Sequence, residues 1–120
     1  MLEIVERENP ELVRHAVELH QDGRIEPGTY LVDLETFADN VRIVRACADD
    51  LELGVYSMTK QWNRNPTMGR MLAEEGLDTF VAVDVRCAIE IQRQNLRLGH
   101  VGHLVQIPKN QIEQVLKMAP

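Results

Sequence analysis

The chain has 120 residues, of which 44% are hydrophobic and 27% are charged, and its net charge is −6. These values indicate one globular domain or a piece of one, and the acidic balance argues against nucleic acid or an anionic membrane as the main partner. No apolar run approaches the ~20 residues of a transmembrane helix, and the N-terminus lacks the basic start and apolar core of a signal peptide. We therefore expect Cys47 and Cys87 to be reduced cysteines of a cytoplasmic protein.

Short apolar runs alternate with amphipathic helical patterns along the chain. A first helix is expected to begin at Pro10, with Asn9 as its N-cap, and to end at Gly23. Buried strands are predicted at 29–34, 53–59, 79–84 and 102–107. Further helices are predicted at 34–51, 66–76 and about 85–95, with a last one capped by Asn110. The helices expected at 34–51 and after Asn110 would bury Leu34, Phe37, Val41, Val44, Ala48 and Leu51, and Ile112, Val115 and Leu116.

The predicted strands begin near residues 29, 53, 79 and 102, at intervals of 24, 26 and 23 residues. Such intervals are typical of strand–helix–strand units with right-handed crossovers and a parallel sheet. Two folds are built from these units, the open doubly wound sheet and the closed eight-stranded barrel of ~250 residues. A doubly wound domain could nearly fit this chain, whereas a barrel could contribute only its first portion. No glycine-rich fingerprint follows a predicted strand, which disfavours a nucleotide-binding sheet.

Lys60 stands where the predicted strand 53–59 passes into a polar loop that ends at Asn65-Pro66, a start signal for the next helix. Side chains at the carboxyl ends of strands carry the chemistry of many α/β folds. A lysine amine in that position can form a Schiff base with a carbonyl compound. A single lysine at a strand end is more often a solvated charge or a salt-bridge partner, so the rest of the chain has to decide whether Lys60 is catalytic.

Three segments, taken in order, resemble one enzyme family. Residues 30–40 are similar to its opening segment, and residues 56–61 fall where it has its cofactor lysine. Residues 76–84, with Glu90 downstream, are similar to its second barrel strand and the following helix. The family is the alanine racemase superfamily, the barrel-type (fold type III) enzymes that use pyridoxal phosphate.

Two motifs narrow this resemblance. Met58-Thr59-Lys60-Gln61 followed by Arg64-Asn65-Pro66, together with the segment 102–108, resembles the YhfX-like branch of the superfamily. The likeness extends from about residue 9 to the end of the chain. It implies an α/β fold in which parallel units form the first part of a (β/α)8 barrel of alanine racemase type. The expected division is an N-terminal helical segment (1–28), a strand and helix (29–52) and the first three barrel units (53–120).

The resemblance also implies a cofactor, pyridoxal 5'-phosphate, held as an internal aldimine on Lys60. Arg64 stands where the family has a residue that contacts the cofactor phosphate, and a guanidinium suits a phosphate chemically. On the predicted strand 102–107, Gln106 and His103 would face opposite sides, and Gln106, nearer the carboxyl end, is the better pocket candidate. His100 and His103 have a spacing seen in metal sites, but no Cys or carboxylate cluster accompanies them, so no metal is expected.

Four functions stay open at this point. The resemblance favours the amino-terminal part of a pyridoxal phosphate-dependent amino-acid racemase, homodimeric in its full-length form, in which Lys60 also moves the α-proton as one of two bases. The alternatives are a lyase or decarboxylase of the same barrel class, a non-catalytic pyridoxal phosphate-binding protein, and a small doubly wound binding domain. Because the family's second domain, opposing catalytic tyrosine and later phosphate loops have no counterpart here, we expect the 120 residues to be an N-terminal fragment that is inactive alone.

Overall fold

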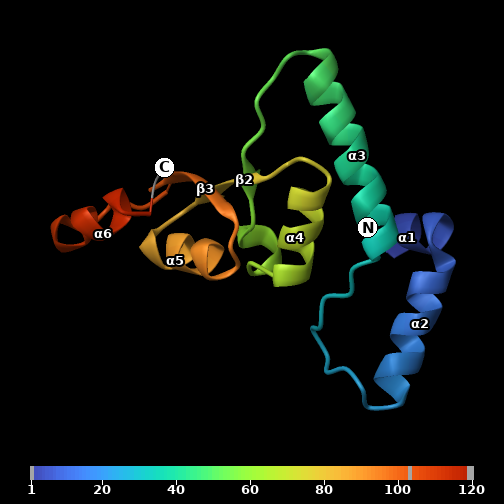
Figure 1. The fold of residues 1–120 in the computed structure, drawn as a ribbon. Helices are drawn as coiled ribbons and strands as arrows, with labels where there is room; N and C mark the ends of the chain where they lie inside the picture. The colour runs from blue at the N-terminus through green and yellow to red at the C-terminus, as the bar shows by residue number, and fades with distance from the viewer. Residues whose placement is uncertain (1, 103, 119–120) are drawn as a thin grey trace. The chain divides into compact units, whose positions relative to one another are not determined.

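The structure is a computed structural model that describes residues 2–102 and 104–118. The chain forms two compact units, Met1–Phe37 and Ala38–Pro120. Figure 1 labels the helices and strands in chain order. None of the helices in the described ranges is long and apolar enough to cross a membrane.

The first unit contains helices α1 (Leu2–Glu8) and α2 (Pro10–Gln21). Helix α2 begins as predicted, because Asn9 Oδ1 accepts a hydrogen bond from the Leu12 amide at 3.0 Å and proline occupies the first helical position. Gly23 follows the helix with a φ of +67°, a left-handed conformation that costs glycine little. Helix α1 was not predicted. Its acidic first turn and basic last turn complement the helix dipole, and this charge order was the available signal.

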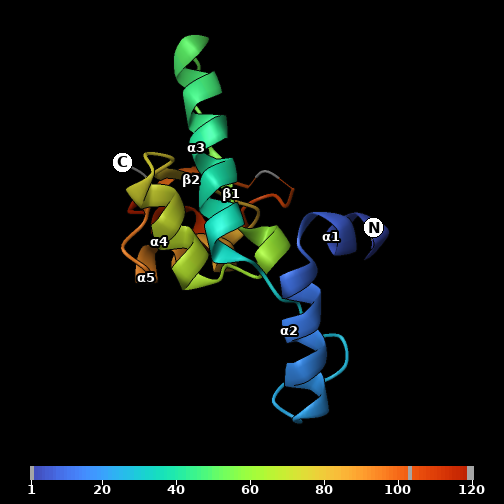
Figure 2. The same cartoon turned by 90° about the vertical axis from the view of Figure 1, so that its right-hand side faces the viewer.

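The strand predicted at 29–34 is wrong. Residues 29–33 have no regular structure, and the chain turns back after α2 (Figure 2) before helix α3 (Leu34–Asp50) begins. A strand needs a neighbour for its backbone N–H and C=O groups, and the sheet of the described residues contains three strands, all of them after residue 56. Tyr30, expected in that strand, is 95% exposed. The prediction came from the β-propensity and apolar content of residues 29–34, but no other strand in the described ranges pairs with this segment.

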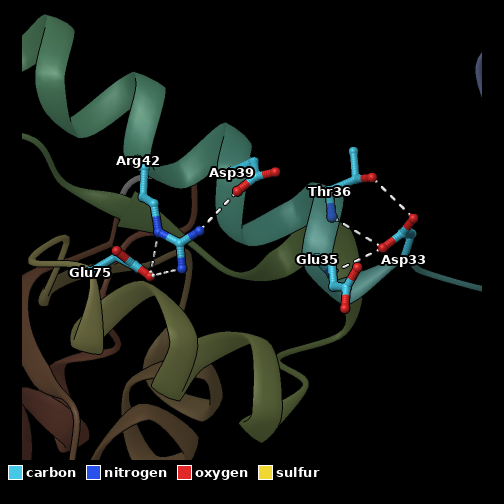
Figure 3. A network of polar contacts seen from close by, with 6 residues as sticks. All are labelled: Asp33, Glu35, Thr36, Asp39, Arg42 and Glu75. Atoms are coloured by element: carbon cyan, nitrogen blue, oxygen red, sulfur yellow. Dashed lines mark hydrogen bonds and ion pairs between the residues drawn. The ribbon is translucent and has the colours of Figure 1, made fainter.

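Asp33 caps the start of α3. Its Oδ1 accepts hydrogen bonds from the amides of Glu35 at 2.9 Å and Thr36 at 3.1 Å, and its Oδ2 accepts from the Thr36 hydroxyl at 3.0 Å (Figure 3). Asn9 Nδ2 donates to the same carboxylate at 2.5 Å, so one asparagine caps α2 and supports the cap of α3. The bonds from Thr36, first its amide and then its hydroxyl, lower the pKa of Asp33 below its ordinary value.

The cap makes the start of α3 sensitive to acid. A lowered pKa in the folded state means that the stabilisation is present above the ordinary aspartate pKa of about 3.9 and is lost as pH falls through the lowered value. Circular dichroism of the wild type should therefore show a loss of helix between about pH 5 and pH 2. In Asp33→Asn the part of this loss that comes from protonation of Asp33 should be absent. Asp50→Asn, at the other end of α3, should keep the acid-linked loss. An unchanged titration in Asp33→Asn would contradict the assignment.

The second unit is built on a parallel sheet of three strands in the order β1-β2-β3: Ser57–Met58, Thr79–Ala82 and Arg97–Val101. The predicted parallel α/β architecture is thus confirmed at this level. Helices α4 (Pro66–Glu74) and α5 (Val85–Arg93) connect the strands, and α5 packs on β2 and β3 (Figure 1). The chain continues through a short 3-10 helix, η2 (Lys109–Gln111), into α6 (Ile112–Leu116).

The core of this unit lies around β2 and α5. Phe80 and Ala82 on β2 and Cys87 and Ala88 on α5 have no exposed surface, and Ile91 is only 1% exposed. Alternating faces of β2 are both covered, as expected for a parallel strand between two neighbours. The predicted stripe of α3 is only partly correct: Val41 and Ala48 are buried, Phe37 is half-buried, and Leu34, Val44 and Leu51 are exposed.

An ion pair joins α3 to the end of α4. Arg42 Nε and Nη2 donate to Glu75 Oε1 at 2.9 and 2.6 Å, and Nη1 donates to Asp39 Oδ1 at 2.8 Å (Figure 3). The hydrogen bond and charge of Glu75 raise the pKa of Arg42. One guanidinium thus bridges a carboxylate of α3 and the carboxylate at the end of α4, and because Arg42 is exposed this link adds little to stability.

The third strand and the last helix depart from the prediction. The strand is β3, Arg97–Val101, and not 102–107, because Gly102 turns the chain with a φ of +90°. His103 lies outside the described residues. Asn110 lies inside η2, so it does not cap α6. In α6 only Val115 is buried, while the expected inward residues Ile112 and Leu116 are 43% and 69% exposed.

Gly99 is the extra residue of a β-bulge in β3. Phe80 pairs with Leu98 and Val81 with His100, so Gly99 has no partner on β2. A Cβ atom on Gly99 would lie 2.4 Å from Thr79 Cγ2 and 2.4 Å from a ring carbon of Tyr56. The bulge therefore requires a residue without a side chain at this position.

Replacing Gly99 by alanine should lower the free energy of unfolding by about 1–3 kcal/mol, because the new methyl group overlaps Thr79 on β2 and Tyr56, the residue before β1. Gly54→Ala is the matched control, since no atom lies within 4 Å of the corresponding Cβ position. Urea unfolding of both variants measures the difference. Equal stabilities of the two variants would show that the sheet accommodates a side chain at the bulge.

Candidate functional site

The strand predicted at 53–59 is reduced to β1, Ser57–Met58, and Lys60 lies two residues beyond it, still on the carboxyl side of the strand. It begins the 3-10 helix η1 (Lys60–Trp62), and its side chain is exposed. Because the three strands are parallel, the residues that follow each of them emerge at the same edge of the sheet. Asp84 follows β2 by two residues at this edge, and Gln106 follows β3 by five. The topology thus gathers an amine, a carboxylate and an amide from three consecutive connections.

The segment 59–65, called the lysine loop below, folds back on itself around Lys60. The Arg64 amide donates to the Thr59 carbonyl at 2.9 Å, and the Asn63 amide donates to the Lys60 carbonyl at 3.3 Å. Asn63 and Arg64 are both left-handed, with φ values of +51° and +59°. Asparagine tolerates this conformation better than arginine does, so the loop carries backbone strain of about 1–3 kcal/mol at Arg64.

Asn65 ends the loop and starts α4. Its Oδ1 accepts hydrogen bonds from the Thr67 amide at 2.9 Å and the Met68 amide at 3.3 Å. This confirms Asn65 as the N-cap before Pro66. One asparagine therefore couples the end of the loop to a helix whose inner residues Met68 and Leu72 are buried.

Two polar atoms beside Lys60 have hydrogen-bonding capacity that the described residues do not use. Thr59 is 2% exposed, and its Oγ1 has no partner within the described ranges; the same holds for the buried Nε of Arg64. Buried polar atoms are normally hydrogen-bonded, and the exceptions concentrate where a ligand or strain is involved. A hydroxyl and a guanidinium suit a phosphate or another oxygen-rich group, so the residues around Lys60 fit a phosphorylated aldehyde cofactor in chemical type.

The half-buried Arg64 side chain is directed toward α5. Contact with the Cys87 side chain is the largest influence and raises the pKa of Arg64; the charges of Asp84 and Glu90 act in the same direction, while burial opposes them. Arg64 therefore stands as a fixed positive charge between the lysine loop and the beginning of α5. Asp84 is the N-cap of α5, its Oδ1 accepting from the Cys87 amide at 2.7 Å.

Gln106 lies in the loop after β3, not on a strand, and it is exposed. It lines a hollow of about 200 Å³ together with Asp84, Val85, Arg86, Ile89, Val105, Pro108 and Gln111. Because β3 ends before residue 102, the expected alternation of His103 and Gln106 on one strand does not apply. Gln106 nevertheless reaches the carboxyl edge of the sheet by way of this loop.

Sequence reasoning did not single out Asp84 or Thr59 as site residues. Asp84 follows a buried strand directly and precedes a helical pattern, which is the same signal that drew attention to Lys60. The burial of Thr59 had no signal in the sequence, because a threonine at a strand end is commonly exposed. Within the described ranges, no three His, Cys, Asp or Glu side chains gather closely enough to hold a metal ion.

Comparison with known proteins gives one informative relative. No family model matches the chain. The chain is similar to the uncharacterized protein YhfX of Escherichia coli (strain K12), with 34% identity over 116 residues, or 97% of the chain. The chain spans 30% of the length of that relative. These values support a YhfX-like relationship, and the name of the relative states no activity.

Proposed function

We propose that the chain carries the cofactor lysine of a pyridoxal phosphate-dependent amino-acid racemase of the alanine racemase superfamily, with Lys60 as the residue that bonds to the cofactor. The observation that carries the proposal is the exposed amine of Lys60 at the carboxyl edge of a parallel sheet, beside two buried polar atoms with unused hydrogen-bonding capacity. The similarity to YhfX supports the branch, and the parallel sheet is compatible with the barrel of that superfamily as well as with a doubly wound sheet.

The residues of the chain have distinct tasks in this proposal. Lys60 would hold the cofactor through its Nζ, and the same amine would be the base that moves the proton at the substrate α-carbon. Arg64 offers its positive charge to the phosphate, and Thr59 offers its hydroxyl. Gln106 lines the same hollow as Asp84, where its side-chain amide would orient a polar substrate group. The cofactor, when bound, would supply an electron-accepting ring that spreads the charge left on the α-carbon.

Lys60 should be the preferred point of covalent attachment. The chain has three lysines, Lys60, Lys109 and Lys117, so the test has internal controls. Incubation with pyridoxal 5'-phosphate, borohydride reduction and peptide mass spectrometry should place the label mainly on Lys60. Lys60→Arg should remove it, and the pair Lys109→Arg and Lys117→Arg should leave it. Equal labelling of the three lysines would refute the proposal.

Arg64 should decide whether the phosphate is recognised. Arg64→Gln is expected to weaken the affinity for pyridoxal 5'-phosphate by about 1.5–3 kcal/mol, the range for hydrogen bonds to a charged group. Unphosphorylated pyridoxal should bind the wild type and this variant alike. Titration of absorbance with each compound measures both affinities. Equal losses for both compounds would return Arg64 to a structural role against α5.

A further inference from the structure

Gln94 connects the lysine loop to the next β-α unit. It is the C-cap residue of α5, and its backbone N–H donates to the backbone carbonyls of Glu90 at 3.3 Å and Ile91 at 3.2 Å. Its side-chain Nε2 donates to the Arg64 carbonyl at 2.9 Å, thirty residues away in the sequence. A side chain of one unit thereby holds the backbone of the loop that belongs to the preceding unit.

The side-chain amide of Gln94 is held in this orientation from two sides. Nε2 also lies 3.5 Å from Glu90 Oε1, so the nitrogen faces two acceptors. Oε1 lies 3.2 Å from the place that a Cβ atom of Gly69 would occupy, and Leu96 Cδ1 lies 2.9 Å from it. The buried Gly69 thus lets α4 pass close to Leu96 and Gln94, and a side chain at this position would require both of these neighbours to shift.

The bond reaches the loop where the backbone is least favourable. Arg64 is a left-handed residue other than glycine or asparagine, and such a conformation persists only when its surroundings hold it. The same residue donates its amide to the Thr59 carbonyl, which closes the loop across Lys60. Release of the Arg64 carbonyl would therefore let Thr59 and Lys60 move together.

We propose that Gln94 is a positioning residue for Lys60, acting through its hydrogen bond to the Arg64 carbonyl. The inference rests on the proposed function, because the position of Lys60 Nζ matters only if this amine bonds to a cofactor. Gln94 itself contacts neither cofactor nor substrate. In the reaction that it supports, the neutral Nζ attacks the aldehyde carbon, a C=N bond replaces the C=O bond, and the oxygen leaves as water with two protons from nitrogen. Correct placement of Nζ raises the rate of this step at Lys60 over the other lysines.

Two substitutions and a matched control test the inference in the 120-residue chain. Gln94→Leu removes the amide, and Gln94→Glu keeps its shape while removing the donor. Gln92→Leu is the control. Gln92 lies in the last turn of α5, two residues before Gln94, and its Nε2 also donates to a backbone carbonyl, that of Met118, at 3.3 Å. Circular dichroism melting identifies the temperature range in which all variants are folded, and the measurements are made there.

The first measurement is amide hydrogen exchange of residues 61–65 without any cofactor. Both Gln94 variants should exchange roughly tenfold faster in this loop, as expected for the loss of one hydrogen bond, and Gln92→Leu should match the wild type. The second is the distribution of reduced pyridoxyl label among the three lysines. The share on Lys60 should fall in the Gln94 variants alone, whereas general loosening of the fold would raise labelling of all three.

The outcomes separate this inference from the proposed function. Wild-type exchange in both Gln94 variants would overturn the inference, and so would faster exchange with an unchanged Lys60 share. If the wild type itself shows no preference for Lys60, the proposed function fails. In that case the exchange measurement still decides whether Gln94 holds the loop, and the positioning of a cofactor lysine is overturned with the function.

Discussion

Strand β2 depends on being paired on both sides, and the rest of the second unit is arranged around that requirement. A parallel strand leaves no backbone group free only when both neighbours are present, and β2 has β1 on one side and β3 on the other. Its side chains are covered as well, since Phe80 and Ala82 have no exposed surface. Once β2 is central and all strands run the same way, the connections after β1, β2 and β3 must emerge at one edge. This is why Lys60, Asp84 and Gln106 share an edge although 46 residues separate the first from the last.

The lysine loop shows how a short segment is held in place by residues outside it. Its own backbone hydrogen bonds close the loop around Lys60, but this shape requires two consecutive left-handed residues, whose conformation is energetically unfavourable. Asn65 fixes the end of the loop to α4, and Gln94 fixes the Arg64 carbonyl to α5. Gly69 contributes by having no side chain, because only then do α4 and the Gln94 amide approach each other. The loop that carries Lys60 is therefore anchored to both α4 and α5.

Asparagine–proline pairs predicted helix starts correctly, whereas Asn110, expected as a cap, lies inside η2, and helix α1 was not predicted. Asn9-Pro10 and Asn65-Pro66 both begin helices, because an asparagine oxygen satisfies free amides and proline needs no donor at the first position. Strand positions were harder. The segment 29–34 has strand-like composition but no partner, and the strand expected at 102–107 was displaced by the turn at Gly102 onto residues 97–101. Both errors have one cause, since a strand exists only through its neighbours and pairing is not visible in local composition.

The sequence by itself determined the alternation of strands and helices, the parallel sheet and the place of Lys60 at a strand end. These depend on periodicity, capping residues and chain lengths, which act over a few residues. The tertiary structure decided the partners of Arg64, the burial of Thr59, the loop position of Gln106 and the bond from Gln94. Each of these joins residues about twenty or more apart in the chain, or depends on what covers them. Such contacts follow from how the β-α units pack, and no local pattern specifies them.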